Sequence, residues 1–284
     1  MRQPLFEHRI ELAGFETRAL ELEGDGPPML LIHGYADSAD TWRLTLDRLG
    51  REGRRAIAID LPGFAEADPL REGSMLEQYD AFAGAAVELA AEDGGEVVVV
   101  GNSLGGAVAL RLASRDDLPV AGVVPVAPAG LDMPRWFSII ERDLLVRGVL
   151  GSRVPMPGPV VRRITGEAYR QLAFARPREA SEDVVRAFTR HHSSARHVKA
   201  FLDVGRRLLP ELTLDAFELD RIDVPVLLVW GDSDRMVSHE GARHVLAQVP
   251  GAEYVELEGC GHCPQLEEPE AFTRLLLAFD PLRL

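Results

Sequence analysis

The hexapeptide Gly-Asn-Ser-Leu-Gly-Gly at 101–106 contains the residues of this sequence best suited to chemistry. Ser103 has a glycine two positions before it and another two positions after it, which allows a sharp turn that exposes the hydroxyl. A valine run precedes the turn and a segment of small residues follows it, the strand–turn–helix context of a nucleophilic serine. The alternative is a serine that only caps a helix. The flanking segments favour a nucleophile.

A serine hydroxyl needs a base that takes its proton, and the base in turn needs an acid that orients it. Of eight histidines, His262 is the candidate base, because it follows the strand-like segment 253–258 on a glycine-containing loop. Asp232 and Asp234 follow another strand-like segment, 226–230, and compete for the role of the acid. The chain order serine, aspartate, histidine is the order expected of a nucleophile on such a turn.

Two cysteines flank the candidate base in the tetrapeptide Cys-Gly-His-Cys at 260–263. Taken alone, Cys260 and Cys263 form a thiol–disulfide exchange motif. That chemistry requires the motif at the start of a helix, after an early strand of a small domain. Here the motif lies on a loop near the end of a much longer chain, so the pattern disfavours redox chemistry.

Three histidines, His191, His192 and His197, raise the question of a metal site. Adjacent histidines on a helix point in different directions, and no carboxylate or cysteine completes a ligand set. We therefore expect no metal, and we interpret these histidines as part of a solvated surface.

Composition limits the classes of protein to which the chain can belong. With 284 residues, 46% of them hydrophobic and 27% charged, it is long enough for one large domain or a domain with an insertion. The net charge of −14 disfavours nucleic-acid partners and docking on anionic lipid. No signal peptide and no stretch of ~20 apolar residues is evident, so we expect a cytoplasmic protein without membrane insertion.

Strand-like and helix-like segments alternate along most of the chain, which predicts a parallel α/β sheet. From about Gly130 to Phe217 the alternation stops, and an Arg-rich, helix-like insertion follows the sixth or so strand. Pro125 lies in the strand-like segment 120–127. Because proline has no N–H to donate to a neighbouring strand, we expect the strand to leave the sheet there. The expected hairpin covers 6–22; further strands are expected over 29–32, 54–60, 96–100, 120–127, 224–230 and 253–258, and helices from 38, over 75–91 and 104–113, from 238 and near the C-terminus.

With these motifs, the chain resembles the α/β-hydrolase superfamily, in the capped branch of esterases, lactonases, perhydrolases and carbon–carbon bond hydrolases. The resemblance covers nearly the whole chain except the insertion. It implies a mostly parallel eight-stranded sheet flanked by helices, with a helical cap after strand six, dividing the chain into core (1–129), cap (130–217) and core (218–284). The matching segments are Leu31-Ile32-His33-Gly34 with Ser38 and Trp42, Asp60-Leu61-Pro62-Gly63-Phe64, the hexapeptide, Trp230-Gly231-Asp232-Ser233-Asp234, and Gly261-His262 with Glu268-Pro269-Glu270-Ala271-Phe272.

The resemblance also implies which acid serves the base. In the family the acid usually lies three residues after the glycine, which selects Asp234 over Asp232. Some relatives place it after the sixth strand, where this chain has Asp132. Gly-His before an acidic-proline helix start is the family's pattern around the catalytic histidine, so the two cysteines are expected to be free thiols.

A developing oxyanion needs two aimed N–H donors. The amide of Leu104, directly after the nucleophile, is expected to be one, and the resemblance implies that the amide of Tyr35 is the other. His33 is expected to brace the Tyr35 loop by hydrogen bonds. At 65–68 the chain has Ala-Glu-Ala-Asp where the family often has Gly-x-Ser, so an unusual substrate mouth is expected.

A serine at this position implies acyl transfer to water, since epoxide hydrolases and haloalkane dehalogenases of this fold attack with an aspartate. We expect cleavage of a carboxylic ester or lactone in a small-molecule acyl substrate, without a cofactor. One alternative is a carbon–carbon bond hydrolase for dienoic diketones from aromatic breakdown, where the same hexapeptide pattern occurs. Another is a non-catalytic receptor for a small ligand. Arg135, Trp136 and Phe137 could line the pocket or pack the cap onto the core.

Overall fold

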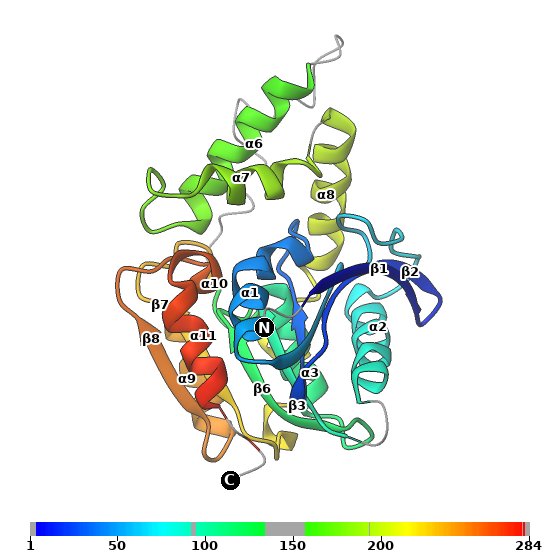
Figure 1. Ribbon diagram of the computed structural model, residues 1–284, viewed down its shortest axis with the longest axis vertical. Coiled ribbons are helices and arrows are strands. Elements are labelled where there is room, and N and C mark those ends of the chain that lie inside the picture. Colours follow the sequence, from blue (N-terminus) through cyan, green and yellow to red (C-terminus); the bar gives the residue numbers. More distant parts are fainter. Residues whose placement is uncertain (1–3, 92–94, 134–156, 193, 280, 282–284) are drawn as a thin grey trace.

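The computed structural model describes residues 4–91, 95–133, 157–192, 194–279 and 281, and an eight-stranded sheet lies at its centre (Figure 1). The strand order is β1-β2-β4-β3-β5-β6-β7-β8. The first two pairs are antiparallel and the other five are parallel. The predicted fold class, a mostly parallel sheet flanked by helices, is confirmed. The strands are β1 (Leu5–Leu12), β2 (Phe15–Leu22), β3 (Asp25–Ile32), β4 (Arg54–Ile59), β5 (Val97–Asn102), β6 (Val120–Val126), β7 (Leu227–Gly231) and β8 (Glu253–Leu257).

The predicted hairpin forms the antiparallel edge of the sheet. Its two-residue turn consists of Ala13 and Gly14, whose φ angles are 49° and 77°. Positive φ at both central residues is the turn geometry that matches the twist of the flanking strands.

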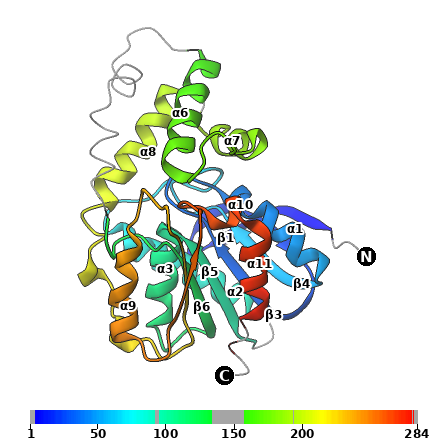
Figure 2. The same ribbon diagram turned by 90° about the vertical axis from the view of Figure 1, so that its left-hand side faces the viewer.

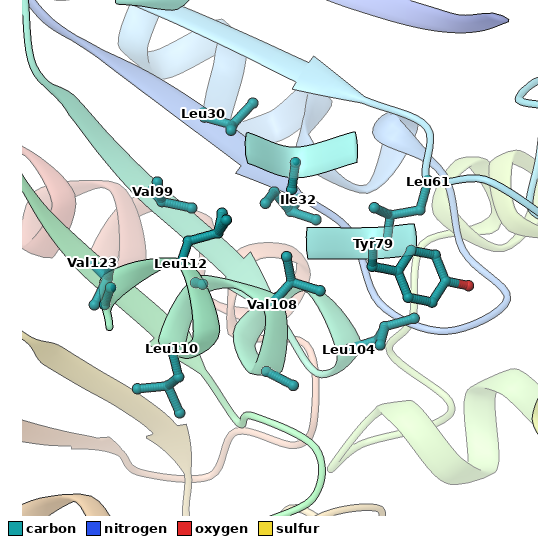
Figure 3. Packing of buried hydrophobic residues seen from close by; sticks show 14 of the residues in the cluster. Leu30, Ile32, Leu61, Tyr79, Val99, Leu104, Val108, Leu110, Leu112 and Val123 are labelled. Atoms are coloured by element: carbon teal, nitrogen blue, oxygen red, sulfur yellow. The ribbon is translucent and has the colours of Figure 1, made fainter. Parts of the chain in front are cut away.

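Helices cover both faces of the sheet because its central strands are buried on both sides. Every residue of β5 is buried, and its valines alternate between two hydrophobic clusters. Figure 2 shows α3 and α9 on one face of the sheet and α1 and α11 on the other. In Figure 3, Val108 and Leu112 of α3 pack against the sheet at Ile32 and Val99. The described helices and 3-10 turns outside the cap helices are η1 (Ala39–Trp42), α1 (Arg43–Arg51), α2 (Met75–Ala90), α3 (Leu104–Ala113), η3 (Leu214–Ala216), η4 (Leu219–Arg221), η5 (His239–Gly241), α9 (Ala242–Gln248), α10 (Pro264–Glu267) and α11 (Pro269–Ala278).

The expectation for Pro125 is wrong, because β6 continues through it to Val126. Pro125 pairs with Gly101 of β5 in parallel register. The amides of Val123 and Ala127 donate toward β7, so the missing N–H of Pro125 falls on the same side. The β6–β7 ladder is short there, which is why the sheet tolerates a proline.

In the described part of the chain, three α-helices lie between β6 and β7 in sequence, at the upper end of the molecule in Figures 1 and 2. They are α6 (Gly158–Ala173), α7 (Glu182–Thr189) and α8 (Ala195–Leu208), and we refer to them as the cap helices. The residues Arg135, Trp136 and Phe137 lie outside the described residues. None of the described helices combines the length and apolar composition needed to cross a bilayer.

Candidate active site

Ser103 lies on a strained turn between β5 and α3. Its φ of 54° and ψ of −111° are a backbone conformation that a residue with a side chain rarely adopts. Three backbone hydrogen bonds hold it there: its amide donates to Val126 O over 2.8 Å, and its carbonyl accepts from the amides of Ala107 and Ala129. The turn directs the side chain of Ser103, 7% exposed, into a cavity beneath the cap helices.

The two glycines of the motif are required by close backbone packing. A Cβ on Gly101 would lie 2.0 Å from the carbonyl oxygen of Gly105, and a Cβ on Gly105 would lie 2.2 Å from that of Ile32. Both separations are shorter than any tolerable contact. The helix can therefore begin directly above the strand only because neither residue has a side chain.

The side chains of His262 and Asp234 are in contact, although 28 residues separate them. The ring Nδ1 of His262 lies 2.7 Å from Asp234 Oδ2, and both side chains are buried. Asp234 Oδ1 accepts hydrogen bonds from the amides of Met236 and Val237, which fix the carboxylate. The opposite ring nitrogen, Nε2, is buried and has no hydrogen-bond partner among the described residues. This nitrogen is available for a proton.

The other two candidate acids form hydrogen bonds elsewhere, Asp232 through its carboxylate and Asp132 through its main-chain carbonyl. Asp232 Oδ1 accepts the amide of Gly259 over 2.9 Å, and the carbonyl oxygen of Asp132 accepts the amide of Ser238. Of the three aspartates, the structure brings Asp234 to the imidazole.

Two backbone segments adjoin Ser103 as expected of oxyanion donors. The amide of Leu104 lies in the first turn of α3, where it has no acceptor within the helix. Tyr35 follows Gly34, and a Cβ on Gly34 would lie only 3.2 Å from the Cβ of Ser103. The hydroxyl of Tyr35 donates to the carbonyl oxygen of Phe201 in α8, so the loop after β3 is also connected to the cap.

His33 braces this loop through both ring nitrogens. Nδ1 donates to Gly34 O over 2.7 Å, and Nε2 accepts the amide of Leu61 over 2.8 Å. Complete burial lowers the pKa of His33 to about 4, so the ring stays neutral at physiological pH. The interpretation of His33 as a bracing residue is confirmed.

Three polar residues near the site were missed by sequence reasoning. Asn102 Nδ2 donates to the carbonyl oxygen of His262 over 3.0 Å, and Asn102 Oδ1 accepts from Gln265 Nε2 over 3.2 Å. Glu267 accepts the amides of Gly261 and Ala175, which joins the histidine loop to the end of α6. The position of Asn102 beside the nucleophile was a signal for its role. Gln265 and Glu267 bond to residues far away in sequence, and sequence patterns do not predict such contacts.

The cavity above Ser103 has a volume of about 110 Å³ and is lined mainly by apolar side chains of the cap helices. Among the described lining residues Asp37 is the only carboxylic acid; it is 8% exposed and accepts the amide of Ser38 over 2.9 Å. Burial raises the pKa of Asp37 to about 7, because the charged form is poorly solvated there. Of the described residues that line the cavity, none is Lys or Arg.

The prediction of a solvated surface is wrong for His192. Its side chain lines the cavity, and Nε2 donates to Ala36 O over 2.7 Å. Burial lowers the pKa of His192 to about 4, so the ring is neutral. His192 follows the end of α7, with its amide donating to the carbonyl oxygen of Thr189, so its ring reaches the cavity from the turn after the helix.

The two cysteines are buried free thiols whose neighbours differ. Cys260 Sγ lies 3.8 Å from Glu267 Oε1, and Cys263 Sγ lies 3.8 Å from Asn102 Oδ1. Burial raises the pKa of both thiols, whereas an exchange cysteine needs a lowered pKa. The expectation of free thiols is confirmed.

The loop at 65–68, expected at the substrate mouth, contacts other parts of the molecule. Glu66 Oε1 lies 3.4 Å from Arg190 Nη2, just after α7, and Asp68 Oδ2 accepts the amide of Glu16 in β2. None of its residues lines the described part of the cavity. The loop therefore connects the cap to the hairpin.

Comparison with known proteins identifies the family of this chain. The model of the alpha/beta hydrolase family matches residues 29–275. The chain belongs to the α/β-hydrolase family. The strained serine turn and the histidine loop described above both lie within the matched region.

Relatives within this α/β-hydrolase family have different activities. The chain is 27% identical over 288 residues to 2-hydroxy-6-oxo-6-(2'-aminophenyl)hexa-2,4-dienoic acid hydrolase of Metapseudomonas resinovorans, covering 96% of this chain and 90% of that protein. It is 24% identical over 269 residues to the monoacylglycerol lipase ABHD6 of Bos taurus, covering 90% and 76%. A crystal structure of a membrane phospholipase A has a TM-score of 0.71 and 26% identity, covering 96% and 85%.

Proposed function

We propose that this α/β-hydrolase is a serine hydrolase that cleaves a carboxylic ester or lactone through an acyl-enzyme on Ser103. The observation that carries the proposal is the pair His262–Asp234, whose free Nε2 borders the same cavity as the strained serine. A buried ring nitrogen without a hydrogen-bond partner destabilises the folded protein. Proton transfer to and from a bound substrate explains why this nitrogen is left unpaired.

In the proposed reaction, Ser103 Oγ attacks the substrate carbonyl carbon while Nε2 of His262 takes the hydroxyl proton. The resulting oxyanion accepts hydrogen bonds from the amides of Leu104 and Tyr35. As the carbon–oxygen bond of the ester breaks, His262 returns the proton to the leaving alcohol oxygen. Water then attacks the acyl-enzyme with the same base, and Asp234 stabilises the imidazolium in both halves.

Labelling by a fluorophosphonate tests the nucleophile. We expect stoichiometric labelling of the protein at Ser103, read by peptide mapping, and none in Ser103→Ala. Failure of the wild-type protein to label would favour the alternative of a non-catalytic small-ligand receptor.

A second candidate is carbon–carbon bond hydrolysis, which the relative from Metapseudomonas resinovorans favours. Its dienoic acid substrates carry a carboxylate, whereas the described cavity lining offers Asp37 and no Lys or Arg. A substrate carboxylate buried beside Asp37, which is partly ionised near its pKa of about 7, is disfavoured by like-charge repulsion. A chromogenic ring-fission product assayed beside short p-nitrophenyl esters separates the two: turnover of the former alone would overturn the ester proposal.

A further inference from the structure

Ser103 borders two hollows of different size. The cavity above it, which we call the large compartment, has a volume of about 110 Å³. A second hollow that also borders Ser103, the small compartment, has a volume of about 20 Å³. Ser103 and Tyr35 border both compartments. A substrate bonded to Ser103 can therefore extend in two directions from its carbonyl carbon.

The proton donor and one oxyanion donor border different compartments. His262 borders the large compartment, whereas Leu104 borders the small one and His262 is absent from its described lining. Because His262 must return a proton to the leaving oxygen, the alcohol has to depart into the large compartment. The acyl group, on the other side of the carbonyl, then lies in the small compartment.

The size of the small compartment limits the acyl group. A water molecule needs roughly 10–15 Å³ of such space, so 20 Å³ admits a methyl or ethyl group. Its walls include Leu208, 1% exposed, and Ala129, 4% exposed, both in the main hydrophobic core. Enlarging it would displace closely packed residues, which is energetically unfavourable.

The large compartment suits the opposite kind of group. Ile164, Leu172 and Leu202 of the cap helices are among its apolar walls, and the described lining holds no cation. An extended, uncharged alcohol matches this surface, and an anionic one does not.

We propose that the substrate is a short-chain ester, an acetate or propionate, of a bulky, uncharged and largely apolar alcohol. This inference rests on the proposed function and narrows it to open-chain esters, because a small lactone cannot place its acyl and alcohol parts in separate compartments. In the acylation step Ser103 Oγ bonds to the carbonyl carbon, the carbon–alkoxy bond breaks, and the alkoxy oxygen takes the proton from His262.

Two series of esters test the assignment in the wild-type protein. The first varies the acyl chain of 2-naphthyl esters from acetate to octanoate, and the second varies the alcohol of acetate esters from ethyl to naphthyl. We expect kcat/KM to fall at least about tenfold between propionate and hexanoate, and to rise with the size of the alcohol.

Variants of one wall residue sharpen the test. Leu209 is partly exposed. It borders the small compartment and is absent from the described lining of the large one. Leu209→Ala should shift the preferred acyl chain to longer lengths, and Leu209→Phe should penalise propionate relative to acetate. Ala168→Leu, in the large compartment, should change the dependence on the alcohol and not that on the acyl chain. Leu246→Ala, which shortens an exposed leucine of α9 away from both described linings, is the matched control and should leave both preferences unchanged.

Fastest turnover of long-chain acyl esters would overturn this inference and leave the proposed function intact. Acyl preference that does not respond to Leu209 would overturn it as well. Absence of turnover with every ester, together with no fluorophosphonate labelling of Ser103, would instead contradict the proposed function itself.

Discussion

The serine turn and the cap helices shape the same cavity by different means. The turn is built from backbone: Ser103 is held by backbone hydrogen bonds, and Gly105 allows the helix to contact the strand. The cap contributes side chains, among them Phe188 of α7 and His192, which follows α7. Reaction geometry is thus fixed locally, while the shape of the substrate space depends on how the cap sits on the core.

The largest effect should come from the reactive centre. Asp234→Asn keeps the shape of the side chain but allows the wrong imidazole tautomer, so we expect kcat to fall about 10⁴-fold. Thermal melting should show that the fold persists. Asp232→Asn is the matched control, since Asp232 bonds to Gly259 N and does not reach the ring. Equal losses in the two variants would contradict the assignment of the acid.

A pair of glycine variants compares turn and cap directly. In Gly105→Ala the new Cβ meets backbone 2.2 Å away, so we expect a loss of at least about 3 kcal/mol of unfolding free energy and of most activity. In Gly166→Ala of α6 it meets side-chain methyl groups at 3.0 and 3.1 Å, which can shift. The higher helix propensity of alanine, about 1 kcal/mol, offsets that crowding. Denaturant unfolding measures both, and a larger loss for Gly166→Ala would refute the comparison.

The buried acid in the large compartment predicts a pH dependence of stability. The pKa of Asp37 is raised from 3.8 to about 7 on folding, so the unfolded chain loses this proton first as the pH rises. Its contribution is therefore intact below about pH 4 and is lost progressively up to about pH 7. Asp37→Asn removes this dependence.

Relative to the wild type, Asp37→Asn should gain up to about 4 kcal/mol of unfolding free energy between pH 4 and pH 8. Urea unfolding of both proteins at several pH values gives the difference. A difference that does not vary with pH would show that Asp37 is not buried as described.

The smallest effect is expected where an exposed arginine of the cap meets the core. Arg190 Nη2 lies 2.8 Å from Asp40 Oδ2; the arginine side chain is 43% exposed, whereas that of Asp40 is buried. Because Asp40 keeps its bonds to Arg18 and Arg43, and solvent and salt screen the exposed arginine, Arg190→Ala should cost at most about 1 kcal/mol of unfolding free energy. The loss should shrink further in high salt, and a loss of several kcal/mol that salt does not change would contradict this account.

Local patterns were enough to predict the sheet, the hairpin turn and the residues around Ser103, because strand periodicity and glycine spacing act over a few residues. The choice of Asp234 over Asp232 followed from the resemblance to the family, in which the acid usually lies three residues after the glycine. The burial of Asp37 and His192 and the bonds of Gln265 and Glu267 could not be predicted in this way. They form only when the cap and the histidine loop pack on the core, and the spacing of residues in the sequence does not predict that packing.

Trapping the covalent intermediate tests the central claim most directly. Mixed with p-nitrophenyl acetate and quenched in acid within the first turnover, the wild-type protein should carry one acetyl group, located at Ser103 by peptide mapping. Release of p-nitrophenol should show a matching burst. An acetyl group on another residue, such as Cys263, or turnover without any adduct at Ser103, would contradict the account.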